Sequence, residues 1–303
     1  MSRALTAIRT LDVPTIEALI ERARQHREHL NSGASKPEGG KRIGLLFFEG
    51  STRTRVSFEQ AAHYLGHTCV NFASQGSSMA KGETFRDTIL TLKHERLDAM
   101  VIRHPASGSA ALAQQFFEGP VINAGDGKHE HPTQALGDAL TIADHFGTLQ
   151  GLTIAIVGDV AHSRVARSNA FLLSMLGNEV RFVGPRTLMP GHPARLPGHI
   201  YYDLNPGIRG ADVVMCLRLQ RERMDDGLLT SVNEFRRMYQ INGNTLRYAN
   251  KDAIVMHPGP MNRGVEIDDL TADGSASHIL NQVENCIFAR MAALDYVFSG
   301  ESA

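Results

Sequence analysis

The chain of 303 residues is poor in cysteine, with only Cys69, Cys216 and Cys286, which lie far apart. This spacing fits neither a disulfide framework nor a cysteine metal site, so we expect buried free thiols and a reducing, cytoplasmic setting. The sequence also lacks any apolar run near the roughly 20 residues that a membrane-spanning helix needs, and no signal-peptide pattern opens it. A soluble protein with no membrane partner is expected.

An excess of charge of one sign is almost absent as well. Lysine and arginine number 31 against 32 aspartates and glutamates, which leaves a formal net charge of −1. A molecule this balanced offers no general field for nucleic acid or an acidic membrane, so any anion must be held by a local cluster of residues. With 42% hydrophobic residues the chain can bury a large core, and its length favours two domains over one.

Apolar strands alternate with amphipathic helices along the sequence. This alternation is typical of βαβ units, and it predicts parallel sheets that helices cover on both faces. The predicted strands are 43–48, 68–73, 99–103, 120–124, 153–159, 179–184, 212–217 and 253–257. Helices are predicted before, between and after the first four of these strands, at 14–30, 55–65, 84–92, 109–117 and 132–147. Further helices are predicted between the later strands.

The fold class that follows is α/β, with two domains that each contain a mostly parallel β-sheet flanked by helices. The boundary between them is predicted at residues 149–152, where a second series of strands begins. We assign residues 1–148 to the first domain and 149–276 to the second. The last segment, 277–303, contains a long helix with an apolar period and is predicted to pack back on the first domain.

The segment FFEGSTRTRVSFE, residues 47–59, places hydroxyls and arginines where a strand turns into a helix. Parallel sheets bind ligands at the carboxyl ends of their strands, and the backbone N–H groups of a helix start can hold an anion there. A simple helix cap would explain the hydroxyls but not the arginines. Arg55 points to another face of the helix, where a structural ion pair is expected. The pattern therefore predicts a phosphate site formed by Ser51, Thr52, Arg53 and Thr54.

Polar residues also follow two later strands. Arg103 closes the strand 99–103 and is expected to add a second guanidinium to the same anion, because a buried strand rarely ends on a charge without a partner. Pro132 suits the first position of a helix, which makes His131 the approximate N-cap and places Gln134 about one turn further on. Both side chains could reach a small polar group beside the phosphate, and the helix start favours the neutral imidazole. Alternatively, His131 is only a cap and Gln134 lies on the surface.

Several motifs together resemble the aspartate carbamoyltransferase family, in order and spacing, from about residue 47 to residue 290. They are FEGSTRTRVSFE, SSMAKGETFRDT, IRHP, GDGKHEHPTQALGD, VGDVAHSRVARSN, LRLQRERM and MHPGPMNRGVEI. Members of this family join carbamoyl phosphate to L-aspartate in pyrimidine synthesis, so the resemblance implies that activity and identifies the anion as the phosphate of carbamoyl phosphate. It implies no metal or other cofactor, and the sequence contains no ligand cluster that would hold a metal.

For carbamoyl phosphate, the resemblance implies a role for each motif residue. Arg103 would contact the phosphate and the carbonyl, His131 the carbamoyl oxygen, and Gln134 the carbamoyl nitrogen. Ser77 and Lys81, in the SSMAKGE loop, would reach the site of a neighbouring subunit in a homotrimer, although spacing alone makes Lys81 a solvated charge in a glycine-flanked turn. The implied binding set is Ser51, Thr52, Arg53, Thr54, Ser77, Lys81, Arg103, His131 and Gln134, of which the implied catalytic residues are Arg53, Thr54, Lys81, Arg103 and His131.

For aspartate, the resemblance implies residues of the second domain together with Lys81. The positions that match those binding the two carboxylates are Arg164, Arg218 and Gln220. The backbone of Pro258 and Gly259 matches the segment that approaches the amine and carbamoyl groups, and Pro260 belongs to the same segment.

Rival interpretations remain at this stage. Ornithine carbamoyltransferases share the phosphate motif, but they carry a cysteine in the HPxQ motif and another near the C-terminus, where this chain has Thr133 and HPGP. A non-catalytic relative would be expected to lack Lys81, Arg164 or Arg218, and all three are present. A dinucleotide-binding dehydrogenase is suggested by IAIVGD, yet no GxGxxG follows. Regulatory or dihydroorotase-like partner subunits are left open by the sequence.

Overall fold

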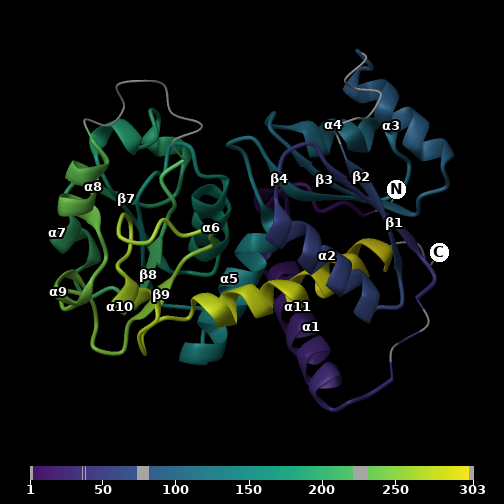
Figure 1. The fold of residues 1–303 in the computed structure, drawn as a ribbon. Coiled ribbons are helices and arrows are strands. Elements are labelled where there is room, and N and C mark those ends of the chain that lie inside the picture. The colour runs from purple at the N-terminus through teal and green to yellow at the C-terminus, as the bar shows by residue number, and fades with distance from the viewer. Residues whose placement is uncertain (1–2, 36, 38, 74–81, 221–230, 300–303) are drawn as a thin grey trace. The chain divides into compact units, whose positions relative to one another are not determined.

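The computed structural model describes residues 3–35, 37, 39–73, 82–220 and 231–299 (Figure 1). The chain divides into two compact units, Met1–Leu140 with Asn285–Ala303, and Thr141–Glu284. Each unit contains one parallel sheet with helices around it, so the predicted α/β class is confirmed. The two divisions fall within the helices α5 (Pro132–Phe146) and α11 (Ile279–Phe298), whereas the predicted domain limits of 148 and 277 lie after α5 and before α11.

The first unit contains a four-stranded sheet of order β2-β1-β3-β4. β1, β3 and β4 read as nearly continuous apolar runs because both of their faces are covered, and all but the first residue of β1 are buried. The edge strand β2 differs, since Thr68, Val70 and Asn71 are exposed. Figure 1 shows α3 and α4 on one face of this sheet and α1 and α2 on the other. The elements are α1 (Val13–Asn31), β1 (Arg42–Phe47), α2 (Thr52–Tyr64), β2 (Thr68–Ala73), α3 (Phe85–His94), β3 (Ala99–His104), α4 (Ser109–Phe116), β4 (Val121–Asp126) and α5 (Pro132–Phe146).

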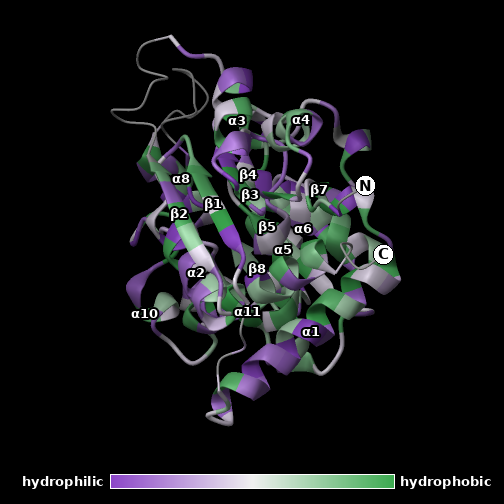
Figure 2. Cartoon of the chain, turned by 90° about the vertical axis from the view of Figure 1, so that its right-hand side faces the viewer, coloured by the Kyte–Doolittle hydropathy of each residue, from purple (hydrophilic) through white to green (hydrophobic). Residues whose placement is uncertain are grey.

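The helix α1 shows how sequence directs packing in this unit. Asp12 caps its start by accepting a hydrogen bond from the Thr15 N–H, and a proline lies in the first turn. Hydrophilic and hydrophobic residues alternate along α1 (Figure 2), and Ile16, Leu19 and Ile20 are buried. The C-terminal helix belongs to the same unit from Asn285 onward. Asp295 on that helix pairs with Arg22 at 2.7 Å and lies 2.9 Å from His26, both on α1, which confirms the predicted packing of the last helix.

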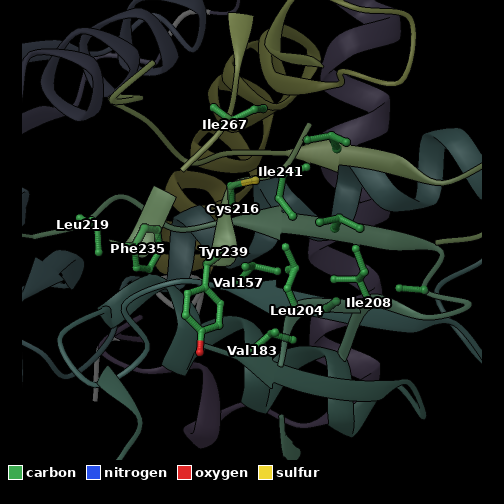
Figure 3. Packing of buried hydrophobic residues seen from close by; sticks show 14 of the residues in the cluster. Val157, Val183, Leu204, Ile208, Cys216, Leu219, Phe235, Tyr239, Ile241 and Ile267 are labelled. Atoms are coloured by element: carbon green, nitrogen blue, oxygen red, sulfur yellow. The ribbon is translucent and has the colours of Figure 1, made fainter. Parts of the chain in front are cut away.

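The second unit contains a five-stranded sheet of order β7-β6-β5-β8-β9. Its core gathers around Val157, Val183 and Cys216 from three neighbouring strands, with Phe235 and Tyr239 from α8 packed against them (Figure 3). The elements are β5 (Thr153–Val157), α6 (Arg164–Met175), β6 (Glu179–Val183), β7 (His199–Tyr201), α7 (Leu204–Ile208), β8 (Val213–Cys216), α8 (Val232–Tyr239), α9 (Gly243–Leu246), β9 (Ile254–Met256), α10 (Asp269–Ala272) and α11 (Ile279–Phe298).

Two differences from the prediction concern the start of α2 and the strand β7. The helix α2 begins at Thr52, three residues before the predicted start, because Ser51 adopts the extended conformation of an N-cap and the hydroxyl-rich stretch forms the first turn. The strand β7 was not predicted, since its three residues are too few to show an alternating pattern. Among the described residues, no helix is both long and apolar enough to cross a membrane.

Candidate active site

The carboxyl ends of β1, β3 and β4 lie side by side, because these strands are neighbours in the first sheet. Phe47 at the end of β1 is in register with Arg103, and His104 at the end of β3 is in register with Asp126. Residues 51–54 follow β1, Arg103 is the second-last residue of β3, and residues 131–134 follow β4. The sheet therefore brings together segments that are far apart in the sequence, as ligand sites of parallel sheets require.

The start of α2 leaves its N-cap side chain unused for capping. Ser51 is its N-cap, but the serine side chain makes no capping hydrogen bond. By contrast, Thr84 and Ser163 do cap α3 and α6 through their side chains. Arg53 is exposed in the first turn of α2, where the positive end of the helix dipole favours an anion. The alternative interpretation of Ser51 as a simple side-chain cap is therefore wrong.

Arg103 has carboxylate and carbonyl partners at the end of β3. Its Nη2 lies 2.9 Å from Oε1 of Glu49, and its Nη1 donates to the carbonyl oxygen of Ala124 at 3.2 Å. Only 15% of the Arg103 side chain is exposed, so the guanidinium is held in one place. For Arg55 we expected an ion pair, but the contact that the structure shows is with an aromatic ring. Its guanidinium lies 5.5 Å from the centre of the Phe47 ring.

Asp126 organises the loop that leads to His131. It is 1% exposed, and it accepts hydrogen bonds from the Gly108 N–H at 2.6 Å, the Asn123 side chain at 2.8 Å and the Glu130 N–H at 3.1 Å. The His129 ring nitrogen lies 3.0 Å from the same carboxylate. Burial by itself would raise the pKa of Asp126, but the hydrogen bonds from His129 and Asn123 bring that pKa below its ordinary value.

We predict that Asp126→Asn lowers the free energy of unfolding by about 2–3 kcal/mol at pH 7, because several hydrogen bonds to a buried charge are lost. A carboxylate with a depressed folded-state pKa stabilises the fold above its unfolded-state pKa of about 4, and this contribution disappears as the pH falls through the folded-state value. Urea denaturation from pH 7 down to pH 3 should therefore show the two proteins converging below about pH 4.

The control for Asp126 is Glu118→Gln in the same unit. Glu118 pairs with Lys93 at 2.6 Å, but 86% of its side chain is exposed and water screens the pair, so the substitution should leave stability nearly unchanged. Equal losses in the two variants, or a loss for Asp126→Asn that does not vary with pH, would contradict the role that we assign to the buried carboxylate.

His131 and Gln134 lie at the start of α5 and are buried, with exposed fractions of 3% and 8%. The surface position that was the alternative for Gln134 is therefore wrong. The helix begins at Pro132, and the carbonyl oxygen of His131 accepts the first helical hydrogen bonds from the N–H groups of Gln134 and Ala135. Nε2 of Gln134 donates to Oδ1 of Asp138 at 2.7 Å, one turn further along the same face.

In the second unit, the loops after β5 and β8 meet because these strands are adjacent. Asp159 is fully buried and lies 2.8 Å from the His162 ring nitrogen, and it also accepts the backbone N–H of Gln220. Burial raises the pKa of Asp159, and the contacts with His162 and Gln220 oppose that rise. Arg164 opens α6 in the first of these loops with 4% exposure, and Arg218 is half-buried in the second.

The loop after β9 has an internal support. The fully buried His257 accepts the Gly259 N–H at Nδ1 at 2.8 Å, so its Nε2 is the nitrogen that donates to Glu266 at 3.1 Å. The same glutamate oxygen accepts the Asn262 N–H at 2.6 Å. Gly259 has a φ of +64°, a left-handed conformation that costs other residues roughly 1–2 kcal/mol. Pro258, Gly259 and Pro260 are thus held beside the edge where β5 and β8 end, because β9 pairs with β8.

Each sheet therefore gathers one half of the predicted site residues. The first unit groups Ser51, Thr52, Arg53, Thr54, Arg103, His131 and Gln134, and the second groups Arg164, Arg218, Gln220, Pro258, Gly259 and Pro260. Ser77 and Lys81 lie outside the described residues. Sequence reasoning missed Glu49, Asp138, Asp159 and Glu266, which hold the predicted residues. Only Asp138 had a sequence signal, since it lies four residues after Gln134 on one helix.

Other features of the described residues lie apart from this chemistry. A cavity of about 640 Å³ in the first unit is lined by residues of α1, α11 and neighbouring loops, none of which is a predicted site residue. Two of its cations already stand over aromatic rings, Arg3 over Tyr296 and Lys41 over Phe298. Within the described part of the chain, no three His, Cys, Asp or Glu side chains are placed to hold a metal ion.

Comparisons with known families match both halves of the chain. Residues 3–144 match the model of the aspartate/ornithine carbamoyltransferase carbamoyl-P binding domain. Residues 150–297 match the model of the aspartate/ornithine carbamoyltransferase Asp/Orn binding domain.

Individual relatives are similar over almost their whole length. The aspartate carbamoyltransferase catalytic subunit of Granulibacter bethesdensis is 50% identical, over 96% of this chain and 93% of its own. That of Rhodospirillum centenum is 49% identical, over 98% and 95%. Aspartate transcarbamoylase from Trypanosoma cruzi in complex with N-(phosphonacetyl)-L-aspartic acid has a TM-score of 0.89 and 34% identity, with 97% and 95% covered. Ornithine carbamoyltransferase from Pyrococcus furiosus has a TM-score of 0.89 and 27% identity, with 99% and 98% covered.

Proposed function

The chain belongs to the aspartate/ornithine carbamoyltransferase family, and from this premise we infer that it transfers the carbamoyl group of carbamoyl phosphate to the amine of L-aspartate. The products are N-carbamoyl-L-aspartate and phosphate, and the reaction belongs to pyrimidine synthesis. The observation that carries this conclusion is the identity of about half of all residues with relatives named aspartate carbamoyltransferase catalytic subunit. The fold cannot decide between the two substrates, because the aspartate and ornithine enzymes give the same TM-score.

We propose that the reaction proceeds by orientation and electrostatic stabilisation. The deprotonated amine of aspartate attacks the carbamoyl carbon, a tetrahedral oxyanion forms, and phosphate leaves with the amine proton. Arg53, Arg103 and His131 would stabilise the charge that develops on the carbamoyl oxygen and the leaving phosphate. Glu49 already holds Arg103 in place at 2.9 Å, so this guanidinium needs little reorganisation when the substrate binds.

Ser51, Thr52 and Thr54 would bind the phosphate oxygens at the start of α2, where the serine hydroxyl is not used for capping. On the second substrate, Arg164, Arg218 and Gln220 would bind the two carboxylates of aspartate. Asp159 supports this set by accepting the N–H of Gln220, so that the two loops keep one arrangement. The backbone of Pro258, Gly259 and Pro260, held through His257 and Glu266, would face the amine and carbamoyl groups.

The choice of the second substrate is the direct test of the function. We expect aspartate to be carbamoylated at least on the order of a hundredfold faster than ornithine at equal concentration, because ornithine carries a cation toward Arg164 and Arg218 in place of a carboxylate. Asparagine should also react poorly, since its amide leaves one buried arginine without a charged partner. A competition assay with both amino acids and separation of the products gives the ratio.

Preference for ornithine in this competition would support the ornithine alternative and reject the assignment. A chain that binds carbamoyl phosphate but yields no product with either amino acid would support the non-catalytic alternative. The presence of Arg164 and Arg218 speaks against that alternative.

We also propose a homotrimer with shared sites, in which Ser77 and Lys81 of one subunit reach the site of the next, in a cytoplasmic setting. The support is the SSMAKGE motif and the resemblance that it carries. The proposal extends to association with regulatory or dihydroorotase-like subunits. Mass measurement of the purified protein, alone and with such partners added, tests each assembly.

A further inference from the structure

The side chain of Gln134 is held in one orientation by two residues behind it. Its Nε2 donates to Oδ1 of Asp138 at 2.7 Å, and the same side chain makes a hydrogen bond with the sulfur of Cys286 on α11. The amide NH2 group of Gln134 is therefore directed at the Asp138 carboxylate. The carbonyl oxygen Oε1 lies on the other side of the amide and is turned away from Asp138.

Asp138 is what makes this orientation the stable one. A carboxylate can only accept hydrogen bonds, so a flipped amide would bring two acceptor oxygens together in a buried place. Asp138 is fully buried, and it interacts electrostatically with Arg290 of α11, which is 3% exposed. Burial lowers the pKa of the Arg290 guanidinium, and Cys286 and Asp138 oppose that effect. The charge of Asp138 is thus balanced inside the first unit.

The surrounding packing leaves little room for another arrangement. Arg290 donates from Nη1 to Oγ of Ser57 on α2, and its guanidinium lies 5.2 Å from the centre of the Phe58 ring. On α5, a Cβ atom added to Gly137 would lie 2.6 Å from the sulfur of Cys286 and 3.0 Å from its Cα. A glycine within a helix costs about 1 kcal/mol relative to alanine, and this close approach of α11 explains why it is present.

We propose that Asp138 is a specificity-determining residue, which orients the Gln134 amide so that its carbonyl oxygen accepts a hydrogen bond from the NH2 group of carbamoyl phosphate. The site then discriminates against acyl phosphates of the same shape that lack this donor, such as acetyl phosphate, in which a methyl group replaces the NH2. This inference rests on the proposed function, because it deepens the role of Gln134 in that reaction. Asp138 touches no substrate and acts through Gln134.

The experiment compares kcat/KM for carbamoyl phosphate and for acetyl phosphate in the wild-type enzyme and in Asp138→Asn. With acetyl phosphate, the amine of aspartate forms a bond to the acyl carbon, the bond from that carbon to the phosphate oxygen breaks, and phosphate leaves with the amine proton. Asparagine at position 138 can accept or donate, so the Gln134 amide is free to flip. We expect the ratio of the two kcat/KM values to fall on the order of tenfold or more, mainly through carbamoyl phosphate.

Two readouts separate this role from a merely structural one. Inhibition by inorganic phosphate, which has no NH2 group, should keep its inhibition constant in Asp138→Asn. Asp144→Asn, the same substitution at an exposed position of the same helix, should leave the ratio unchanged. If Asp138→Asn reduces both substrates and phosphate binding equally, the proposal is overturned.

Asp138→Asn leaves the buried Arg290 charge without its balancing carboxylate, and the variant could fail to fold for that reason. A second variant keeps the proposal testable in that case. Asp138→Asn combined with Arg290→Met removes both charges, and it should show the same fall in the ratio. An unchanged ratio in this double variant overturns the proposal. Gln134→Ala tests the premise separately, because an unchanged ratio there would show that Gln134 does not contact the carbamoyl nitrogen at all.

Discussion

Arg53→Ala is expected to lower kcat on the order of a hundredfold or more while the protein keeps its fold. The substitution removes a fixed positive charge from the place where charge develops on the oxyanion and on the leaving phosphate. Arg53 is exposed in the first turn of α2, so the fold should persist without its side chain. Steady-state kinetics and a thermal melt of the same preparation measure the two effects.

Arg55→Ala is the matched control, because Arg55 lies on the same helix two residues further and stands over the Phe47 ring. We expect this variant to keep most of its activity and to lose on the order of 1 kcal/mol of stability with the cation–π contact. If Arg53→Ala also kept most of its activity, Arg53 would have no place in the site.

Mixing two inactive variants is expected to restore about a quarter of wild-type activity. The variants are Arg53→Ala and Lys81→Ala, unfolded together and reassembled. In a cyclic trimer with shared sites, each site takes Arg53 from one chain and Lys81 from its neighbour, so every mixed trimer contains one intact site. Random assembly makes about three quarters of the trimers mixed, with one good site in three. Activity is measured after subunit exchange has been demonstrated by mass.

The control for this experiment pairs Arg53→Ala with Arg103→Ala. Phe47 at the end of β1 is in register with Arg103, so both arginines belong to the site half of one chain. No mixture of these two variants can create an intact site, and no activity should return. Recovery in the control, or hybrids of the first pair that are as inactive as their parents, would count against a site shared through Lys81.

The elements and many of the site residues could be predicted because their signals are local. The strand β1 is a continuous apolar run, and the hydroxyls and arginines after it stand within a few residues of one another. The start of α5 was predicted at Pro132 because proline suits the first helical turn. The start of α2 was predicted three residues late, because serine and threonine are as typical of a loop as of a first helical turn.

By itself, the sequence determined the α/β class, the order of the elements along the chain and the polar groups at the strand ends, because these depend on residues close together in the chain. The tertiary structure alone decided the order of strands in each sheet and the partners of the site residues. Glu49 reaches Arg103, and Asp159 reaches Gln220, across more than fifty residues of chain. Such pairs depend on which strands become neighbours, and an apolar run has no feature that specifies its neighbour in the sheet.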